Sequence, residues 1–268
     1  MGFVYTSAYM GELYVGTSGF SYKDWAGPFY PKDLRQGDFL HFYSSRFSFV
    51  ELNFSYYRQP AAQMMEQMRQ KVPESFLFSI KAHQSMTHER GADWKEQCGQ
   101  FRGGIGPLLE NNQCAGVLLQ FPYSFHYTGE NRHYLDALLK ELKELPLLVE
   151  FRNSEWDLQS VRDELRERSI GLVLTDMPAL EKLPGPSRVM TADTAYIRFH
   201  GRNRENWWSG DNVSRYDYLY SREELEERLP DLQLLLNSSR RLFIAFNNHH
   251  KGQAVQNAFQ IIELLSNG

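Results

Sequence analysis

Eight short runs of apolar, β-branched or aromatic residues recur along the chain, and they constrain its fold more than any other feature. They begin at about residues 13, 48, 76, 115, 147, 171, 194 and 241. Several runs are apolar on successive residues, which is typical of strands covered on both faces. Helical patterns occupy residues 33–46, 60–71, 94–111, 131–144, 157–168, 222–236 and 253–265. This alternation predicts parallel strands joined by helical crossovers.

Eight such units in 268 residues favour an α/β fold consisting of one closed (β/α)8 TIM-type barrel. An open doubly wound sheet usually carries a glycine-rich nucleotide turn after its first strand, and the GTSG turn at 16–19 lacks that spacing. Residues 178–193 contain three prolines, so we expect the sixth helix to be short or missing. We assign residues 1–12 to an N-terminal extension and residues 13–268 to a single barrel domain.

The charge balance excludes a general electrostatic attraction for nucleic acid. Lys and Arg number 29 against 33 Asp and Glu, a formal net charge of -4, so any nucleic-acid binding must be local. Cys98 and Cys114 are the two cysteines; they cannot form a disulfide framework, and they fit a reducing compartment. No segment approaches 18 uncharged apolar residues, and the first residues lack an export signal. We therefore expect a cytoplasmic protein without a membrane segment.

Polar side chains follow every one of the eight apolar runs. In a barrel of this type the carboxyl ends of the strands form the active face. Four runs end with two polar residues spaced two apart, which puts both side chains on one face of the strand. The polar residues at the strand ends are Ser18, Glu51, Asn53, Lys81, His83, Gln120, Glu150, Arg152, Asp176, Arg198, His200, Asn247 and Asn248.

These residues suit catalysis or anion binding. Carboxylates act as acids, bases or metal ligands, and Arg and Lys bind phosphate or carboxylate. Our catalytic candidates are Glu51, Lys81, Glu150 and Asp176. Our substrate-binding candidates are Ser18, Asn53, His83, Arg152, Arg198, His200, Arg202, Trp207, Asn247 and Asn248. Each residue alone is also compatible with an ordinary charge pair that closes the barrel, but the convergence of so many ionisable groups favours a functional site.

A metal site would draw on Glu150, Asp176 and His200, with Glu51 or His83 as a further ligand. The cations expected in the same mouth would repel a divalent ion, and neither H-x-x-x-H nor H-E-x-x-H occurs, so we assign no metal ligand and leave the cofactor open. Lys81 could form a Schiff base if burial and neighbouring arginines lower its pKa. The alternative is an ion pair between Lys81 and Glu51 or Glu150.

The segment GRNRENWWSG at residues 201–210 follows the seventh run directly. Arg202 and Arg204 lie near Trp207 and Trp208 in the sequence. Arginines can bind phosphate, and tryptophans can stack on a base or a sugar. Tryptophans that roof the barrel, with flanking arginines in solvent, are the alternative interpretation.

Seven ordered motifs closely resemble the YecE-like family, domain of unknown function 72. They are VGTSGFSYKDWAGPFYP (15–31), FVELNFSYYRQP (49–60), FSIKAHQSMTH (78–88), LLQFP (118–122), VEFRNSEW (149–156), AYIRFHGR (195–202) and FNNHHKGQAVQNA (246–258). The resemblance implies a (β/α) barrel and supplies no established reaction. The family's barrels look similar to the endonuclease IV and xylose isomerase group, which implies a phosphodiester or DNA-repair substrate by analogy of fold. That group uses a His-rich metal cluster, whereas the matching strand ends here carry Lys81, Arg152 and Arg198.

Three functional hypotheses follow. The leading one is an enzyme, a hydrolase or a lyase, or else an anion-dependent binding protein. It acts on a phosphorylated or carboxylated sugar-like or nucleotide substrate at the carboxyl-terminal mouth of the barrel. The second is a non-catalytic nucleic-acid-binding protein related to DNA repair, and the third is a metal-dependent phosphodiesterase similar to endonuclease IV. We expect the mouth to take an anion more readily than a divalent metal. The sequence leaves the oligomeric state open.

Overall fold

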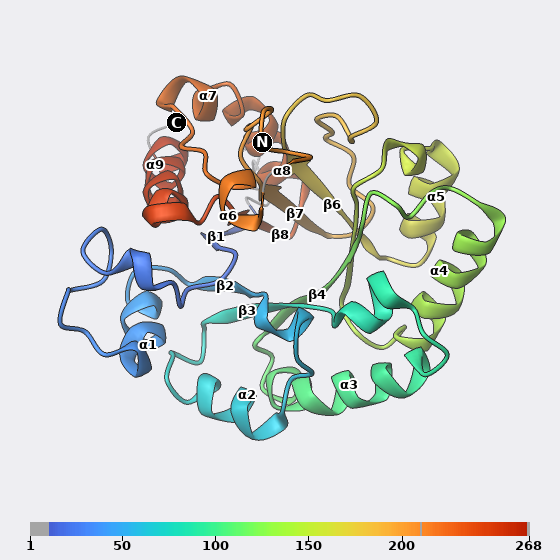
Figure 1. Ribbon diagram of the computed structural model, residues 1–268, viewed down its shortest axis with the longest axis horizontal. Coiled ribbons are helices and arrows are strands. Elements are labelled where there is room, and N and C mark those ends of the chain that lie inside the picture. The colour runs from blue at the N-terminus through green and yellow to red at the C-terminus, as the bar shows by residue number, and fades with distance from the viewer. Residues whose placement is uncertain (1–10, 210, 267–268) are drawn as a thin grey trace, which may run out of the picture.

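The computed structural model describes residues 11–209 and 211–266. Its eight strands are all parallel, and the helices surround them on the outside (Figure 1). The strands are β1 (Glu12–Thr17), β2 (Phe49–Leu52), β3 (Leu77–Lys81), β4 (Cys114–Phe121), β5 (Leu147–Phe151), β6 (Gly171–Asp176), β7 (Thr194–Phe199) and β8 (Arg241–Phe246). The predicted TIM-type fold is confirmed. The predicted N-terminal extension, 1–12, lies outside the described residues except for its last two positions.

The helices of the second half of the chain agree with the sequence prediction at one segment and differ from it at another. Residues 177–193, all of them described, contain no helix, in agreement with the missing sixth helix. The segment 222–236 divides into two helices, with Pro230 near the start of the second, where a missing N–H is tolerated. The helices are α1 (Phe39–Ser44), α2 (Ala62–Arg69), α3 (Trp94–Glu110), α4 (Gly129–Glu141), α5 (Gln159–Glu167), α6 (Asn212–Arg215), α7 (Arg222–Glu226), α8 (Leu229–Ser238) and α9 (Gln253–Ser266).

The barrel is nearly closed. Its strands follow the order β1-β8-β7-β6-β5-β4-β3-β2, and the two ends of this series meet in a single parallel bridge between Ser18 and Glu51. Gly16 permits the approach of β1 to β2, because a Cβ atom there would stand 2.2 Å from the carbonyl oxygen of Phe49. Closure therefore depends on a backbone position without a side chain and ends beside one of the predicted catalytic residues.

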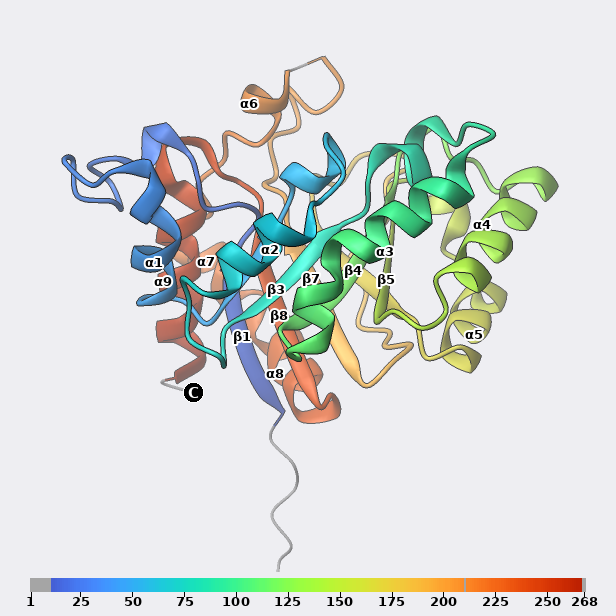
Figure 2. The same ribbon diagram turned by 90° about the horizontal axis from the view of Figure 1, so that it is seen from below.

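Alternation along the strands separates a narrow interior from a large outer core. Inside the barrel, Phe49, Leu148, Tyr196 and Phe243 pack in one apolar layer with residues of the other strands. Positions two residues further along each strand face the same interior, so the layer above contains the polar residues of the strand ends. Helix α6 and its loop lie over this end of the barrel (Figures 1 and 2).

The strand residues that alternate with these inward-facing ones point outward and pack against the helices. Val117, Leu119, Val149 and Ile197, for example, belong to the outer core, together with the buried faces of α3, α4 and α9. Among the described helices, none combines the length and the apolar character that crossing a membrane would require.

Candidate functional site

A cavity of about 460 Å³ opens at the carboxyl-terminal ends of the strands. Its walls are aromatic and cationic, and among the described residues no acidic side chain lines it. The lining residues are Tyr22, Asn53, Tyr56, Tyr57, Lys81, His88, Gln120, Pro122, Tyr123, Arg152, Leu183, Arg198, Trp207, Trp208, Arg215, Tyr216, Asn247 and His249.

Arg198 of β7 organises the floor of this cavity. Its guanidinium donates one hydrogen bond from Nη2 to Oε1 of Glu51 (2.6 Å) and another from Nη1 to Oε2 of Glu150 (2.7 Å). The hydroxyl of Tyr196 donates to the second oxygen of Glu51 (2.8 Å). Both carboxylates are completely buried. Charge-assisted bonds of this kind offset the cost of burying carboxylates so deeply.

Arg152 provides the second cation of the floor. Its Nε donates to Oε1 of Glu150, and its Nη2 lies 3.4 Å from Nδ1 of His200. Burial opposes ionisation of Glu150, but Arg152 and Arg198 outweigh it and hold the pKa of this carboxyl well below its usual range. Glu150 is therefore a permanent anion that pairs with two guanidinium groups, rather than a proton donor at neutral pH.

His200 joins the floor in its neutral form. Burial, followed by the charge of Arg152, lowers the pKa of the imidazole well below its usual range. Arg152 can only donate, so Nδ1 of His200 accepts and the ring proton resides on Nε2, 3.3 Å from Oε1 of Glu150. The amide nitrogen of Asn247 lies 3.1 Å from the same Nδ1. Four strand ends are thus connected through one network.

Lys81 differs from the arginines because it has no carboxylate partner among the described residues. Its Nζ donates to Oε1 of Gln120 (2.8 Å) and lies 4.3 Å from the ring centroid of Tyr56. The ion pair with Glu51 or Glu150, considered from the sequence, does not form, because the arginines occupy both carboxylates. Burial, reinforced by the charges of Arg198 and Arg152, lowers the pKa of Lys81 from 10.5 to about 7.

Aromatic rings form the walls above these polar groups. Tyr22 stacks on the imidazole of His249, with ring centroids 4.6 Å apart. Trp207 is 3% exposed, and its ring lies 5.8 Å from the guanidinium carbon of Arg152. Trp208, by contrast, is 51% exposed and stands edge-on to Tyr123 at the rim. Aromatic faces at a polar cavity are suited to stacking on sugar rings or bases.

Comparison with known proteins places this barrel in a family. The family described as "Protein of unknown function DUF72" matches residues 14–268. The chain belongs to the DUF72 family. The resemblance to the YecE-like family, which is the same family under another name, is thereby confirmed.

The relatives of this DUF72 chain include proteins of known structure. A DUF72 family protein of Thermotoga maritima is 40% identical, with a TM-score of 0.87 over 95% of this chain and 99% of that one. A DUF72 family protein of Enterococcus faecalis is 26% identical, with a TM-score of 0.84 over 95% of each chain. The UPF0759 protein YunF of Bacillus subtilis is 32% identical over 94% of each chain. The family has no established reaction, so the chemistry must be argued from the site.

The structure does not bring Asp176 and Arg202 to the cavity. Arg202 donates from Nε and Nη2 to the two oxygens of Asp176 (2.9 and 2.8 Å), and the hydroxyl of Tyr220 donates to the same carboxylate (2.8 Å). Val173 faces the barrel interior, so Asp176, three residues later, faces outward. Its carboxylate connects β6 to the segments outside the barrel wall, and the geometry offers it no access to a ligand in the mouth.

Several other predicted residues lie beside or below the cavity. The amide nitrogen of Asn248 donates outward, to the carbonyl of Tyr218 and to Asn257 (2.8 Å each). His83 lies 2.8 Å from the hydroxyl of Ser85 and does not line the cavity. Ser18, Glu51, Glu150 and His200 are fully buried beneath the lining. The residues singled out from the sequence that reach the cavity are Asn53, Lys81, Gln120, Arg152, Arg198, Trp207, Trp208 and Asn247.

The structure adds residues that were not among the candidates, chiefly Arg215, His88 and His249. Arg215 lies on α6, and its Nε has no hydrogen-bond partner within the described part of the chain. His88 lies on the π-helical turn Ser85–Glu89; burial, then the charge of Lys81, lowers its pKa to about 4. The barrel pattern gave no signal for Arg215 and His88, since neither follows a strand directly, whereas His249 lies just past the end of β8.

No group of three or more His, Cys, Asp or Glu side chains with the spacing of a metal site occurs among residues 11–209 and 211–266. The carboxylates named from the sequence as metal ligands already have protein partners. Glu150 accepts from two arginines, and Asp176 accepts from Arg202 and Tyr220.

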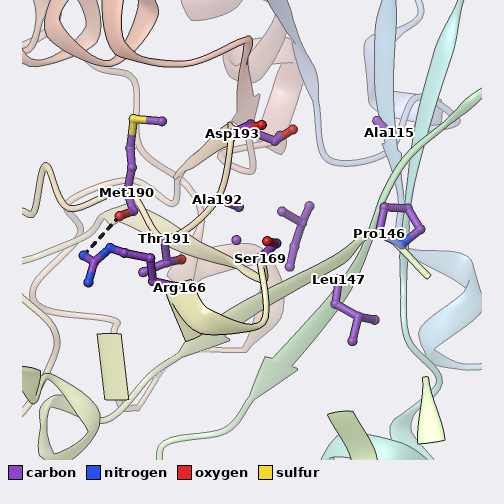
Figure 3. A pocket seen from close by; sticks show the side chains of 12 residues that line it. Ala115, Pro146, Leu147, Arg166, Ser169, Met190, Thr191, Ala192 and Asp193 are labelled. Carbon is purple, nitrogen blue, oxygen red and sulfur yellow. Dashed lines mark hydrogen bonds between the residues drawn. The ribbon is translucent and has the colours of Figure 1, made fainter. Parts of the chain in front are cut away.

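A second cavity, of about 470 Å³, lies at the opposite end of the barrel (Figure 3). It is lined by the starts of β5, β6 and β7 together with the segment before β7. Arg166 donates to Asp163 (2.6 Å) and to the carbonyl of Met190 (3.4 Å), and Thr191 donates to the carbonyl of Ile170 (2.6 Å). These polar groups bind other groups of the protein, and residues at this end of a barrel usually contribute to stability rather than to function.

Proposed function

We propose that this DUF72 protein is an enzyme that acts on a small phosphorylated or carboxylated, sugar-like or nucleotide substrate at the mouth of the barrel. The charge imbalance of the cavity carries the proposal. Two buried carboxylates, Glu51 and Glu150, oppose three arginines that line the cavity, Arg152, Arg198 and Arg215, and Lys81 adds part of a positive charge at pH 7. An anionic ligand would restore the balance and replace the hydration that the cations lose.

Arg152 and Arg215 are the best-placed residues for the anionic group. Arg152 uses Nε for Glu150 and Nη2 for His200, and among the described residues its Nη1 has no protein acceptor. Arg215 adds a second guanidinium from α6. A planar guanidinium already oriented by a carboxylate loses little freedom when it binds phosphate or carboxylate. The exposed face of Trp208 and the tyrosines of the wall would contact the uncharged part of the substrate.

Catalysis rather than simple binding is supported by three titratable groups with shifted pKa values in one cavity. Lys81 has a pKa of about 7 and His88 of about 4, and burial also lowers the pKa of His249. All three groups are therefore partly or wholly neutral at pH 7, so they can accept protons or attack as nucleophiles. Such shifts cluster at active sites more often than elsewhere on a protein.

The geometry gives less support to a nucleic-acid-binding protein. Of the loop that suggested this function, Arg202 is bound to Asp176 and Trp207 is buried. Only Arg204 and Trp208 of the basic and aromatic set remain exposed, which is a small surface for a polynucleotide. The endonuclease-like alternative has no metal cluster in the described residues to support it.

Calorimetry with glycerol 3-phosphate and with glycerol tests the anion site. We expect one molecule of the phosphate ester to bind per chain, more weakly at higher salt concentration, and no measurable binding of glycerol. Equal binding of the two compounds, or binding only of a single-stranded oligonucleotide, would contradict the proposal. NMR of the protein mixed with phosphorylated and carboxylated sugars then tests catalysis, because binding without conversion of any compound would favour a binding protein.

A further inference from the structure

We infer that Lys81 is a covalent nucleophile, which forms a Schiff base with the carbonyl carbon of an anionic aldehyde or ketone. The inference rests on the proposed function, since it takes the anion site as the element that positions the substrate. It adds the chemical class of the substrate and assigns the protein to the lyases rather than to the hydrolases.

The contacts of Lys81 leave its amine available. Nζ reaches the cavity from the end of β3, between Gln120 and the ring of Tyr56. The amide nitrogen of Gln120 donates to the carbonyl of Phe121 (2.9 Å), which turns its oxygen toward Lys81. This oxygen accepts one N–H and cannot donate, so it orients the amine without engaging the nitrogen lone pair.

The neighbouring arginines explain why this lysine has no counter-ion. Glu51 and Glu150 lie close enough to raise its pKa, but Arg198 and Arg152 hold their oxygens and add repulsion of their own. Desolvation and this repulsion favour the neutral amine, which is the nucleophilic form. An ion pair would have kept the lysine protonated. The buried quartet of Glu51, Arg198, Glu150 and Arg152 therefore serves to activate Lys81 as well as to support the floor.

The covalent step balances without any further reagent. The lone pair of Nζ attacks the carbonyl carbon, and the carbonyl π electrons move to the oxygen, which takes up a proton. The resulting carbinolamine loses water, which carries away the former carbonyl oxygen, and a protonated imine remains. In sum, one proton is consumed and one water is released. The imine is an electron sink for breaking a bond at the adjacent carbon, which is the chemistry of a lyase.

Borohydride trapping tests the inference on the wild-type protein. The protein is incubated with pyruvate or with glyceraldehyde 3-phosphate, reduced with borohydride, and examined by intact mass and peptide mapping. We expect one adduct per chain, located on Lys81, and none without the carbonyl compound. Trapping should accelerate as the pH rises through about 7 and then level off, because deprotonation supplies the nucleophile. Adducts spread evenly over surface lysines would overturn the inference.

Two variants separate this inference from the proposed function. Lys81→Arg keeps a cation but has no primary amine, so we expect it to lose the adduct. Lys95→Arg, an exposed position on α3, should keep the adduct on Lys81. Retained phosphate binding with no site-specific adduct in wild type would reject the Schiff base alone. Absence of phosphate binding in wild type would reject the anion site itself. Thermal unfolding establishes that each variant is folded, and the wild-type peptide map decides the matter without them.

Discussion

Two networks of buried charge stand at the carboxyl ends of neighbouring strands, and only one of them faces the cavity. Arg198 of β7 pairs in register with Thr175 of β6, and the next pair joins Asp176 to Phe199. Arg198 and Asp176 are therefore one step apart along the barrel, yet one points inward and the other outward. The comparison shows that the parity of a single residue decides whether a charge at a strand end belongs to the mouth or to the wall.

The two networks also differ in how they are enclosed. In the inner network, Glu51 and Glu150 are fully buried and the side chain of Arg152 is 11% exposed. In the outer network, Asp176 is 4% exposed but Arg202 is 25% exposed and has Glu224 within 3.3 Å as a second acceptor. Two arginines of the inner network, Arg152 and Arg198, line the cavity. The outer network connects β6 to α7 and has an alternative partner.

The largest expected effect concerns stability, and it comes from neutralising one carboxylate in each network. Glu150→Gln removes the carboxylate partner of Arg152 and leaves Arg198 with Glu51, and both guanidinium groups are largely buried. We therefore expect a loss of about 3–5 kcal/mol in the free energy of unfolding. Asp176→Asn should cost about 1–3 kcal/mol, because Arg202 can turn to Glu224. Urea denaturation at pH 7 measures both values.

The pH dependence of the same pair gives a control. The pKa of Glu150 is lowered in the folded protein, so its contribution to stability is present above the ordinary value of 4.5 and is lost as the pH falls. The difference between wild type and Glu150→Gln should therefore shrink below pH 4.5. An equal or larger cost for Asp176→Asn at pH 7 would show that enclosure does not distinguish the networks.

This contrast also explains what the sequence could predict. The spacing Glu150-x-Arg152 and Arg198-x-His200 places both members of each pair on one face, and these pairs do converge in the floor. The run GLVLTDM around β6 is apolar on both faces, so it carries no alternation to show which way Asp176 points. Its placement with the catalytic candidates followed from its position at a strand end alone.

Arg215 and His88 were beyond the reach of the strand pattern for another reason. They lie on α6 and on an isolated π-helical turn, and tertiary packing rather than local periodicity brings these segments over the mouth. The charge of the mouth also differs from the sequence expectation, because Asp176 faces away from the cavity and Arg215 lines it. The sequence thus predicted the fold and the residues that converge in the floor, but neither their ion pairs nor the excess of positive charge.

An intermediate effect is expected on ligand affinity from replacing one arginine in each network by lysine. Arg152→Lys keeps the charge but loses the planar guanidinium, which can contact Glu150 and an oxyanion at the same time. The affinity for glycerol 3-phosphate should therefore fall about tenfold. Arg202→Lys alters the outer network in the same way and should leave the affinity unchanged. Calorimetry compares the two variants. If Arg152→Lys binds as wild type does, or if it unfolds, Arg152 is only a structural partner of Glu150.

The smallest effect on ligand affinity should come from the rim, where the adjacent residues Trp207 and Trp208 differ in burial. Trp207 is buried against Met177 and Leu183, and Trp208 is 51% exposed. Trp207→Ala should cost about 3–5 kcal/mol of stability by leaving a hole in the wall. Trp208→Ala should leave stability nearly unchanged but remove a stacking surface of about 0.5–1.5 kcal/mol, a two- to tenfold loss of affinity for a bound sugar phosphate. Thermal unfolding and calorimetry on both variants separate these outcomes. Unchanged affinity in Trp208→Ala would confine the substrate to the floor of the cavity, with the phosphate at Arg152 and no contact at the rim.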